Sequence, residues 1–207
     1  MKYILYYTLL CLFFCSCKTI CFEANQTLYK KMEYSQNGKV KYGFSDVFDN
    51  IVILYKYNDA KQFNEGLAAV ANHENKYGFI NKKDSIVIPF KYDYASSFGE
   101  YEFEGLAIVK MMNDWYLNPH MTYGMMGFIN HQGELVVPMI YNTFAYDREF
   151  GLFRVTNQKG NFGWLDKKAK EVIPCEHDSI IDISNNIFTL RKGSKIVRYD
   201  NKGNRLR

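Results

Sequence analysis

The sequence predicts an all-β protein made of tandem repeats, each a short antiparallel meander, stacked into an elongated, solenoid-like array or closed into a propeller-like ring. Two observations support this prediction. Short runs of β-branched and aromatic residues alternate with polar turns along most of the chain, as in strands joined by hairpins. Glycine, proline and tyrosine recur at fixed offsets, which indicates a repeat architecture. The pattern does not fix the curvature of the array.

The clearest copy of the repeat spans residues 76–110. We expect strands at residues 77–80, 86–88 and 106–110, because these runs are β-branched or aromatic and are bounded by turn residues. Pro89 is expected to end the second strand, since proline has no N–H to donate to a neighbouring strand. Three short strands cannot bury their own apolar face, so neighbouring copies must cover it.

The repeat is defined by a glycine, the large apolar residue after it and a proline eleven residues after the glycine. The glycines lie 35, 49 and 36 residues apart and are Gly43, Gly78, Gly127 and Gly163. The residues that follow them are Phe44, Phe79, Phe128 and Trp164. The prolines are Pro89, Pro138 and Pro174, with Leu54 at this place in the first copy. An aromatic ring comes fourteen residues after each glycine, at Tyr57, Tyr92, Tyr141 and His177. A glycine inside a strand marks a bend or the close approach of another backbone.

These residues resemble the WG repeat family, also called KWG repeats, of bacterial proteins. The matching segments are residues 41–44, 76–79, 126–128 and 162–164, with a second half at residues 65–68 and 104–107. The tryptophan that gives the family its name is replaced by Tyr42, Tyr77, Met126 and Phe162. The resemblance covers residues 40–207. It implies a β-repeat fold and, more weakly, a binding role, and the family as a whole has no established general activity.

The chain is expected to divide into three parts. Residues 1–16 are predicted to be a signal peptide, residues 17–36 a lipidated tether or an irregular first strand, and residues 37–207 the β domain. The copies are expected at residues 41–75, 76–122, 123–160 and 161–194, with an atypical partial fifth copy at residues 195–207. They are called copies 1 to 5 below. Terminal repeats are often atypical because they cover the end of the stack.

The first residues predict export to a bacterial envelope. Lys2 precedes the apolar run of residues 4–14, and Ser16 precedes Cys17, as in a signal peptide. Residues 14–17 resemble a bacterial lipobox, which implies that Cys17 carries lipid and that the protein is anchored at the outer membrane or cell surface. A transmembrane anchor is less well supported, because the apolar run is shorter than the ~20 residues that a span needs. Cleavage followed by secretion is the remaining alternative.

No motif in the sequence predicts catalysis, a cofactor or a metal site. The chain lacks the common nucleophile, zinc and phosphate-binding motifs. Glu102 and Glu104 lie on one face of a predicted strand, where we interpret them as a solvated edge. Cys21 and Cys175 are left for the exported domain; they form a disulfide, which export permits, or Cys175 is a small core residue.

Charge argues against a nucleic-acid partner. The formal net charge is +4, and basic and acidic residues are interleaved throughout the chain. A protein that binds nucleic acid needs a basic stripe along the phosphate backbone, and no such stripe is present.

About 13 additional residues separate copies 2 and 3. This insertion contains Trp115, Tyr116, Pro119, His120 and Tyr123. It is interpreted as a partner-binding loop, because tryptophan, tyrosine and methionine are enriched at interfaces, or as a lengthened hairpin whose methionines fill gaps in the core. A copper(I) site is a weaker interpretation, since the thioether and imidazole groups lack a regular spacing.

The sequence therefore predicts a non-catalytic envelope lipoprotein whose repeats bind or scaffold a protein partner. The alternative is a carbohydrate or cell-wall binding module that uses the repeated aromatic faces as platforms. Exposure distinguishes the two: coplanar rings facing solvent favour sugar, and buried rings with one apolar patch favour protein.

Overall fold

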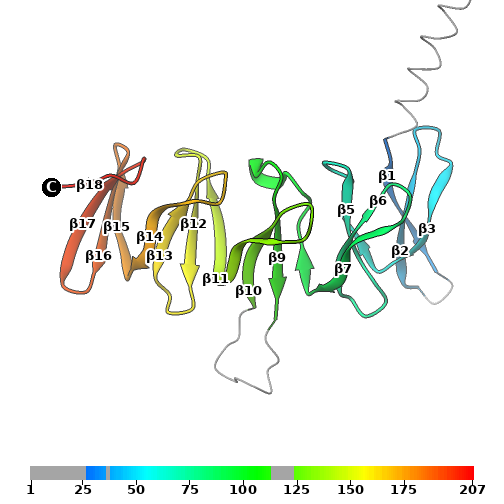
Figure 1. The fold of residues 1–207 in the computed structure, drawn as a ribbon, viewed down its shortest axis with the longest axis horizontal. Helices are drawn as coiled ribbons and strands as arrows, with labels where there is room; N and C mark the ends of the chain where they lie inside the picture. Colours follow the sequence, from blue (N-terminus) through cyan, green and yellow to red (C-terminus); the bar gives the residue numbers. More distant parts are fainter. Residues whose placement is uncertain (1–26, 36–37, 113–123) are drawn as a thin grey trace, which may run out of the picture.

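The computed structural model describes residues 27–35, 38–112 and 124–207, and these residues form an all-β array. Figure 1 shows the sheets side by side along one axis, with the first strand and the last strand at opposite ends of the molecule. The array is therefore open and elongated, which confirms the solenoid-like alternative over the closed ring. In the described part of the chain the only helical segment is a 3-10 turn, η1 (Glu100–Glu102).

Short strands follow one another through the described residues in a continuous meander. They are β1 (Tyr29–Tyr34), β2 (Val40–Ser45), β3 (Ile51–Tyr57), β4 (Asp59–Ala60), β5 (Leu67–Ala71), β6 (Tyr77–Asn81), β7 (Ile86–Tyr92), β8 (Tyr94–Ala95), β9 (Ala107–Met111), β10 (Met125–Ile129), β11 (Leu135–Asp147), β12 (Leu152–Asn157), β13 (Phe162–Leu165), β14 (Glu171–His177), β15 (Ser179–Ser184), β16 (Ile187–Lys192), β17 (Lys195–Asp200) and β18 (Arg205–Leu206). The order in each sheet follows the order in the chain: β1-β2-β3, β4-β5-β6-β7, β8 to β14, and β15-β16-β17-β18.

Each copy passes into the next through one extended run of chain. β3 is followed directly by β4, β7 by β8, and β14 by β15, so the run belongs first to one sheet and then to the next. In copy 3 the same run is the single 13-residue strand β11, which pairs with β10 at its start and with β12 at its end. The copies are therefore linked by shared strands and do not form separate domains.

The four repeat glycines occupy equivalent positions, opposite a bulge in the next strand. In copy 2, Tyr77 pairs with Tyr92 and Phe79 with Ile88, so two steps along β6 are matched by four along β7. The same shift occurs in copies 1, 3 and 4. A Cβ built on Gly78 would lie 2.6 Å from the carbonyl oxygen of Ile88, which leaves no room for a side chain. The predicted close approach of another backbone is confirmed.

The prediction that proline ends the second strand was wrong. Pro89, Pro138 and Pro174 lie inside β7, β11 and β14, and each strand continues past its proline. The bulge explains the difference, because bulged residues are released from the hydrogen-bonded ladder and a missing N–H costs nothing there. Leu54 takes the same place in β3, which has the same length and the same burial pattern as β7.

The hydrophobic core lies between consecutive copies. Phe44 and Ala68 of copy 1 pack in one cluster with Ile80 of copy 2. On the opposite face of β6, Phe79 packs toward β9 and β10 with Val109 and Ile129, since neighbours along a strand point to opposite faces. Two further clusters join copy 3 to copy 4 and copy 4 to the chain that follows it. Each copy is therefore covered by its neighbour, as the sequence predicted.

Among the described residues, seven turns share one hydrogen-bonding pattern. In each, the side-chain oxygen of an Asp or Asn accepts hydrogen bonds from the backbone N–H groups two and four residues later, and the residue three positions on has a positive φ. The Asp and Asn residues are Asp46, Asn72, Asn81, Asn130, Asn157, Asp166 and Asp200. This is the Asx turn, in which the side chain replaces a backbone acceptor.

The two ends of the described array depart from the regular repeat. Tyr29–Tyr34 form β1, paired with β2 along its whole length, so these residues are a first strand, one of the two alternatives given for residues 17–36. In copy 5, Val197 stands at the glycine position, is buried and pairs with Leu190. β18 pairs with β17 only through Arg198 and Tyr199. No bulged strand crosses Val197 in the described chain, and a side chain fits there.

Cys175 is a free, half-buried thiol in β14. Burial raises its pKa to about 11, and its sulfur lies 3.0 Å from the carbonyl oxygen of Asn161. The thiol therefore packs within the array as a weakly acidic, unreactive group. Cys21 lies outside the described residues.

Replacing Phe79 by Ala should lower the free energy of unfolding by about 3–5 kcal/mol, because its ring is fully buried between copies. Phe48→Ala is the matched control, since that ring is 65% exposed and its loss should cost less than about 0.5 kcal/mol. Urea unfolding followed by circular dichroism measures both. Equal effects of the two substitutions would contradict the described packing.

Candidate functional site

An aromatic cleft of about 490 Å³ opens on the face of the sheet that joins copies 2 and 3. Of the ten lining residues in the part of the chain that the structure describes, eight are aromatic, aliphatic or methionine, so this lining is mostly apolar. These are Tyr94, Tyr101, Ile108, Met112, Met126, Phe144, Tyr146 and Phe153. The other two, Asp93 and Lys110, are charged. The cleft has the size and the apolar lining that small-ligand and peptide sites commonly have.

Strand alternation brings these side chains to one face. Ile108 and Lys110 are alternate residues of β9, and Met112 directly follows its last residue; alternate residues along a strand share a face. Lys110 is the cross-strand partner of Tyr94 on β8 and of Met126 on β10. The floor of the cleft is therefore set by the register of three neighbouring strands.

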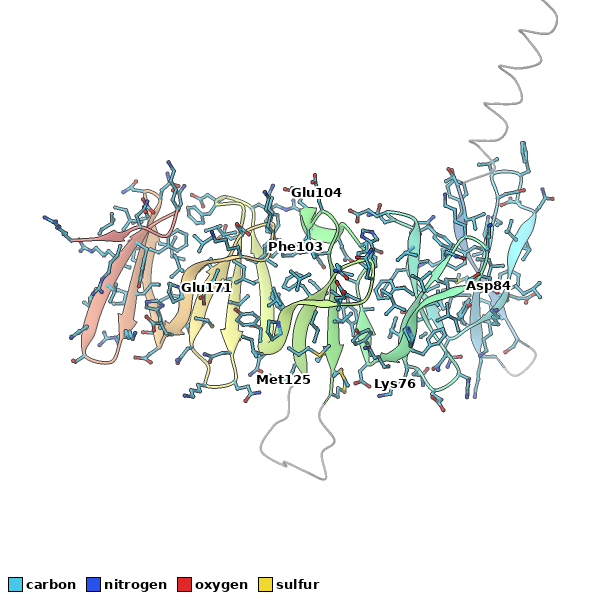
Figure 2. All side chains as sticks on the ribbon, viewed as in Figure 1. Lys76, Asp84, Phe103, Glu104, Met125 and Glu171 are labelled. Carbon is cyan, nitrogen blue, oxygen red and sulfur yellow. The ribbon has the colours of Figure 1, made fainter. Side chains whose placement is uncertain are left out.

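A stack of rings forms one wall of the cleft. Tyr146 lies on Phe153 with ring centroids 4.6 Å apart, and Phe153 lies on Phe103 at 3.7 Å. Phe103 is buried and points into the array (Figure 2). The Tyr146 hydroxyl donates to the Glu102 carboxylate at 3.2 Å, and Glu102 also pairs with Lys167. Packing below and a hydrogen bond above hold Tyr146 in place.

Tyr101 stands at the rim on a strained turn. Gly99, Tyr101 and Glu102 all have a positive φ, a conformation that costs energy for residues other than glycine. The Tyr101 side chain is 50% exposed. The nearby Glu100 carboxylate raises the pKa of Tyr101, and burial followed by Glu100 raises that of Tyr94. Both phenols therefore remain neutral hydrogen-bond donors at physiological pH.

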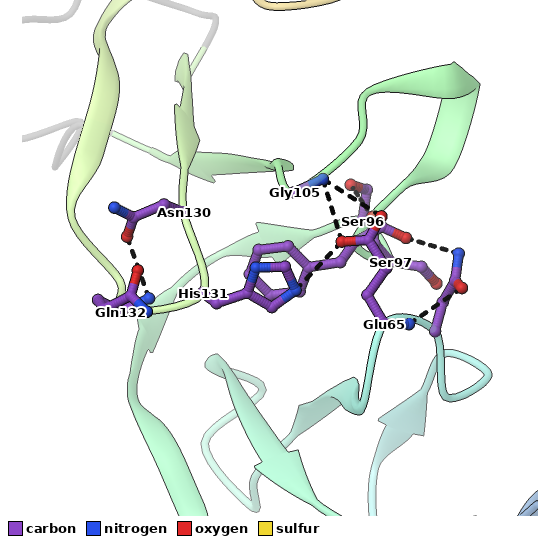
Figure 3. Close-up of polar contacts among 9 residues, drawn as sticks. Glu65, Ser96, Ser97, Gly105, Asn130, His131 and Gln132 are labelled. Atoms are coloured by element: carbon purple, nitrogen blue, oxygen red, sulfur yellow. Dashed lines mark hydrogen bonds and ion pairs between the residues drawn. The ribbon is translucent and has the colours of Figure 1, made fainter.

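Contacts from copies 1 and 3 hold the two ends of this turn (Figure 3). The Asn64 amide donates to the Phe98 carbonyl oxygen at 2.7 Å, and the Glu65 carboxylate accepts the Gly105 N–H at 3.1 Å. His131 lies 3.1 Å from Glu65 and stacks on Phe98 with ring centroids 4.2 Å apart. These contacts fix the segment that carries Tyr101, although none of them touches the cleft.

The charged groups of the cleft are not equivalent. Asp93 is paired with Lys76 at 2.5 Å, and its second oxygen accepts the Met112 N–H at 2.7 Å. Lys110 forms no ion pair with any residue that the structure describes. The available charge in the cleft is therefore the Lys110 ammonium group.

The predicted insertion residues Trp115, Tyr116, Pro119, His120 and Tyr123 lie outside the described residues, as does the predicted lipidation site, Cys17. The ends of the insertion are described. Met111 and Met125 are cross-strand partners, and Met112 and Met126 line the cleft. The insertion therefore leaves the array from strand ends next to the cleft.

Carboxylates and histidines do not gather into a metal site in the part of the chain that the structure describes. Glu102 is paired with Lys167 and Tyr146, while Glu104 is exposed on the same turn (Figure 2). Over the same residues, no helix is long and apolar enough to cross a membrane.

Four consecutive segments of the chain match the family model described as WG containing repeat. They are residues 42–77, 77–115, 126–160 and 162–195. The chain belongs to the WG-repeat family. Its repeat glycines and the aromatic rings beside them fall within these segments, so the shared sequence pattern corresponds to the bulge and to the core between copies. A search of curated proteins finds no match to this WG-repeat chain.

Two solved structures are distantly similar to the WG-repeat array. One is a eukaryotic initiation factor, with a TM-score of 0.44 and 8% identity over 86% of this chain and 50% of the other. Another is the WD40 β-propeller domain of Doa1, with a TM-score of 0.32 and 11% identity over 88% of this chain and 67% of the other. The WG-repeat chain spans half the length of the first. Both scores are too low to support a conclusion.

Sequence reasoning did not find the cleft. Its rings come from η1 and from strands of copies 2 and 3, and none of them sits at a repeat-defining position. The available signal was the density of aromatic residues between Tyr92 and Phe103, which exceeds that of the equivalent segment in copy 1.

Glu65→Ala should lower the free energy of unfolding by roughly 1–2 kcal/mol, because the Gly105 N–H and His131 lose a charged partner at a partly exposed site. It should also raise hydrogen exchange in residues 99–105. Glu104→Ala, on the same turn and exposed, is the matched control and should change neither. If the Glu65 variant exchanges like the wild-type chain, the turn is held by other contacts.

Proposed function

We propose that this WG-repeat chain is a non-catalytic binding or scaffolding protein of the bacterial envelope, held to a membrane by lipid on Cys17. Its site is the aromatic cleft between copies 2 and 3, and its ligand is an extended segment of a protein partner. The observation that supports this most strongly is one large, mostly apolar cleft whose accessible rings are held in place from below and from both sides.

The lining suggests the chemistry of the bound segment. Tyrosine, phenylalanine and methionine give large contact area, and such residues dominate the centres of protein interfaces. The neutral hydroxyls of Tyr94 and Tyr101 can donate to backbone carbonyl groups of an extended chain. Lys110 favours a segment with a carboxylate close to its apolar side chains.

The repeated aromatic rings that suggested a carbohydrate-binding module are buried. The repeated rings Tyr57, Tyr92, Tyr141 and His177 are at most 6% exposed, and they pack inside the array. A sugar-stacking platform needs a flat ring face open to solvent. Buried repeat rings beside one apolar cleft favour a protein ligand.

We propose that the insertion contributes to the same site. Its ends are the paired residues Met111 and Met125, next to Met112 and Met126 in the cleft. Loop lengthening costs only about 0.6 kcal/mol per doubling, so an addition here leaves the core between copies intact. Its sequence is rich in the residue types that interfaces use.

Tyr101→Ala should abolish or strongly reduce partner capture by the detergent-solubilised full chain while leaving its melting temperature within about 2 °C of wild type, because the ring is half exposed. Tyr34→Ala is the matched control, since Tyr34 is 69% exposed on β1, away from the cleft. Mass spectrometry of the captured proteins measures the effect.

Two further variants localise the interaction. A photo-reactive amino acid at Met112 should form a covalent adduct with the captured partner, and deletion of residues 113–123 should reduce capture. Undiminished capture by the Tyr101 variant, or adducts that form only outside the cleft, would contradict the proposed site. If cell-wall oligosaccharides compete with partner capture, the carbohydrate alternative would be favoured instead.

Cys17→Ala should abolish incorporation of labelled palmitate and leave an uncleaved or mislocalised precursor, because the thiol is the expected site of lipid attachment. Cys21→Ala, four residues later, is the matched control and should keep the label. If the label persists in the Cys17 variant, the lipid is attached at another site or the predicted anchor is wrong.

A further inference from the structure

The turn between β2 and β3 differs in one respect from its counterparts in the other copies. The two residues after the Asp or Asn of this turn are polar in copies 2 to 5: Lys82 and Lys83, His131 and Gln132, Lys167 and Lys168, and Asn201 and Lys202. In copy 1 they are Val47 and Phe48. The hydrogen bonds of the turn are the same in all five, so only the chemistry of its tip has changed.

The turn displays these two side chains on a well-fixed backbone. The Asp46 carboxylate accepts the N–H groups of Phe48 and Asn50 at 2.8 and 2.9 Å. Asp49, the residue with the positive φ, pairs with Lys31 of β1 at 2.5 Å. Phe48 is nevertheless 65% exposed and Val47 39% exposed. An apolar tip on a rigid turn with no covering group in the described chain indicates a surface that meets something outside the array.

The tip lies beside the place where the chain enters the array. Tyr29, at the start of β1, pairs with Ser45, the last residue of β2 before the turn. Figure 1 shows the start of β1 and the β2–β3 turn at the same edge of the first sheet. Tyr29 is the twelfth residue after Cys17, a reach of at most about 40 Å. A lipid on Cys17 would keep this edge close to the bilayer.

Neighbouring side chains extend the apolar edge. Ser45 pairs with Ile51 across β2 and β3, so Tyr29 and Ile51 flank it on either side. Tyr29 is 45% exposed and Ile51 41% exposed. Lys31 at this edge is paired with Asp49. Aromatic and aliphatic side chains gathered at one edge match the interfacial layer of a membrane, where apolar groups enter the acyl boundary.

We propose that Val47 and Phe48 insert into the interfacial layer of the phospholipid membrane to which the chain is anchored, as a second point of attachment. This rests on the lipid anchor of the proposed function. One attachment point leaves the array free to swivel, whereas two fix the edge of its first sheet on the bilayer. The cleft between copies 2 and 3 is then held at a set orientation to the membrane surface.

The test uses the full, lipidated chain reconstituted into vesicles of phosphatidylethanolamine and phosphatidylglycerol. One variant carries Phe48→p-benzoylphenylalanine, and the matched control carries Lys83→p-benzoylphenylalanine at the same place in copy 2. On irradiation, position 48 should form adducts with radiolabelled phospholipid in about tenfold or greater excess over position 83, since burial of a large ring is worth at least one factor of ten. Val47→Lys added to the first variant should reduce the lipid adduct several-fold.

Flotation of the vesicles separates failure of this proposal from failure of the anchor. A chain that floats with the vesicles but forms no excess lipid adduct at position 48 would overturn the docking and leave the anchor standing. Adducts at position 48 with another protein, or with a second copy of the chain, would overturn it in favour of a protein contact. If the chain does not float with the vesicles, the proposed lipid anchor is wrong, and the proposed membrane docking of Val47 and Phe48 is then wrong as well.

Discussion

The close approach of a bulged strand to a glycine is the contact on which the rest of this array depends. At Gly78 the carbonyl oxygen of Ile88 lies only 2.6 Å from the position that a Cβ would take. The bulge that brings it there shifts the pairing of β6 and β7 by two residues, and bulges bend the strand and increase its twist. The bent chain leaves its own sheet and becomes the first strand of the next, so each bulge fixes how one copy joins the following one.

Stacking and binding both follow from this connection. Because successive copies share a strand, Phe44, Phe79, Phe128 and Trp164 are buried between neighbours and not within a single copy. The arrangement changes where β11 passes unbroken from β10 to β12. There the strained turn of Tyr101 and the ring stack under Tyr146 border an open cleft. A regular core thus provides the rigid support that a binding site on its surface requires.

The sequence predicted the repeat, the strands and the crowding at the glycines, because these depend on residues at fixed local offsets. It failed at Pro89, Pro138 and Pro174, because a proline inside a bulge and a proline at a strand end look alike in sequence. It also failed at the cleft, because Tyr94, Tyr101 and Phe153 meet only through the register of distant strands. The exposed tip at Val47 and Phe48 was visible in the alignment of the copies, but its position beside β1 required the structure.

The unfolding free energy of the Gly78→Ala variant tests the central contact most directly. The added methyl group must displace the backbone of β7, which we expect to cost about 1–3 kcal/mol as overpacking. Val197→Gly is the comparison variant, because Val197 takes the glycine position in copy 5 and no bulged strand crosses it there. This variant should also be less stable than the wild-type chain, but for a different reason: it loses a buried side chain. A Gly78→Ala variant as stable as the wild-type chain would contradict the account.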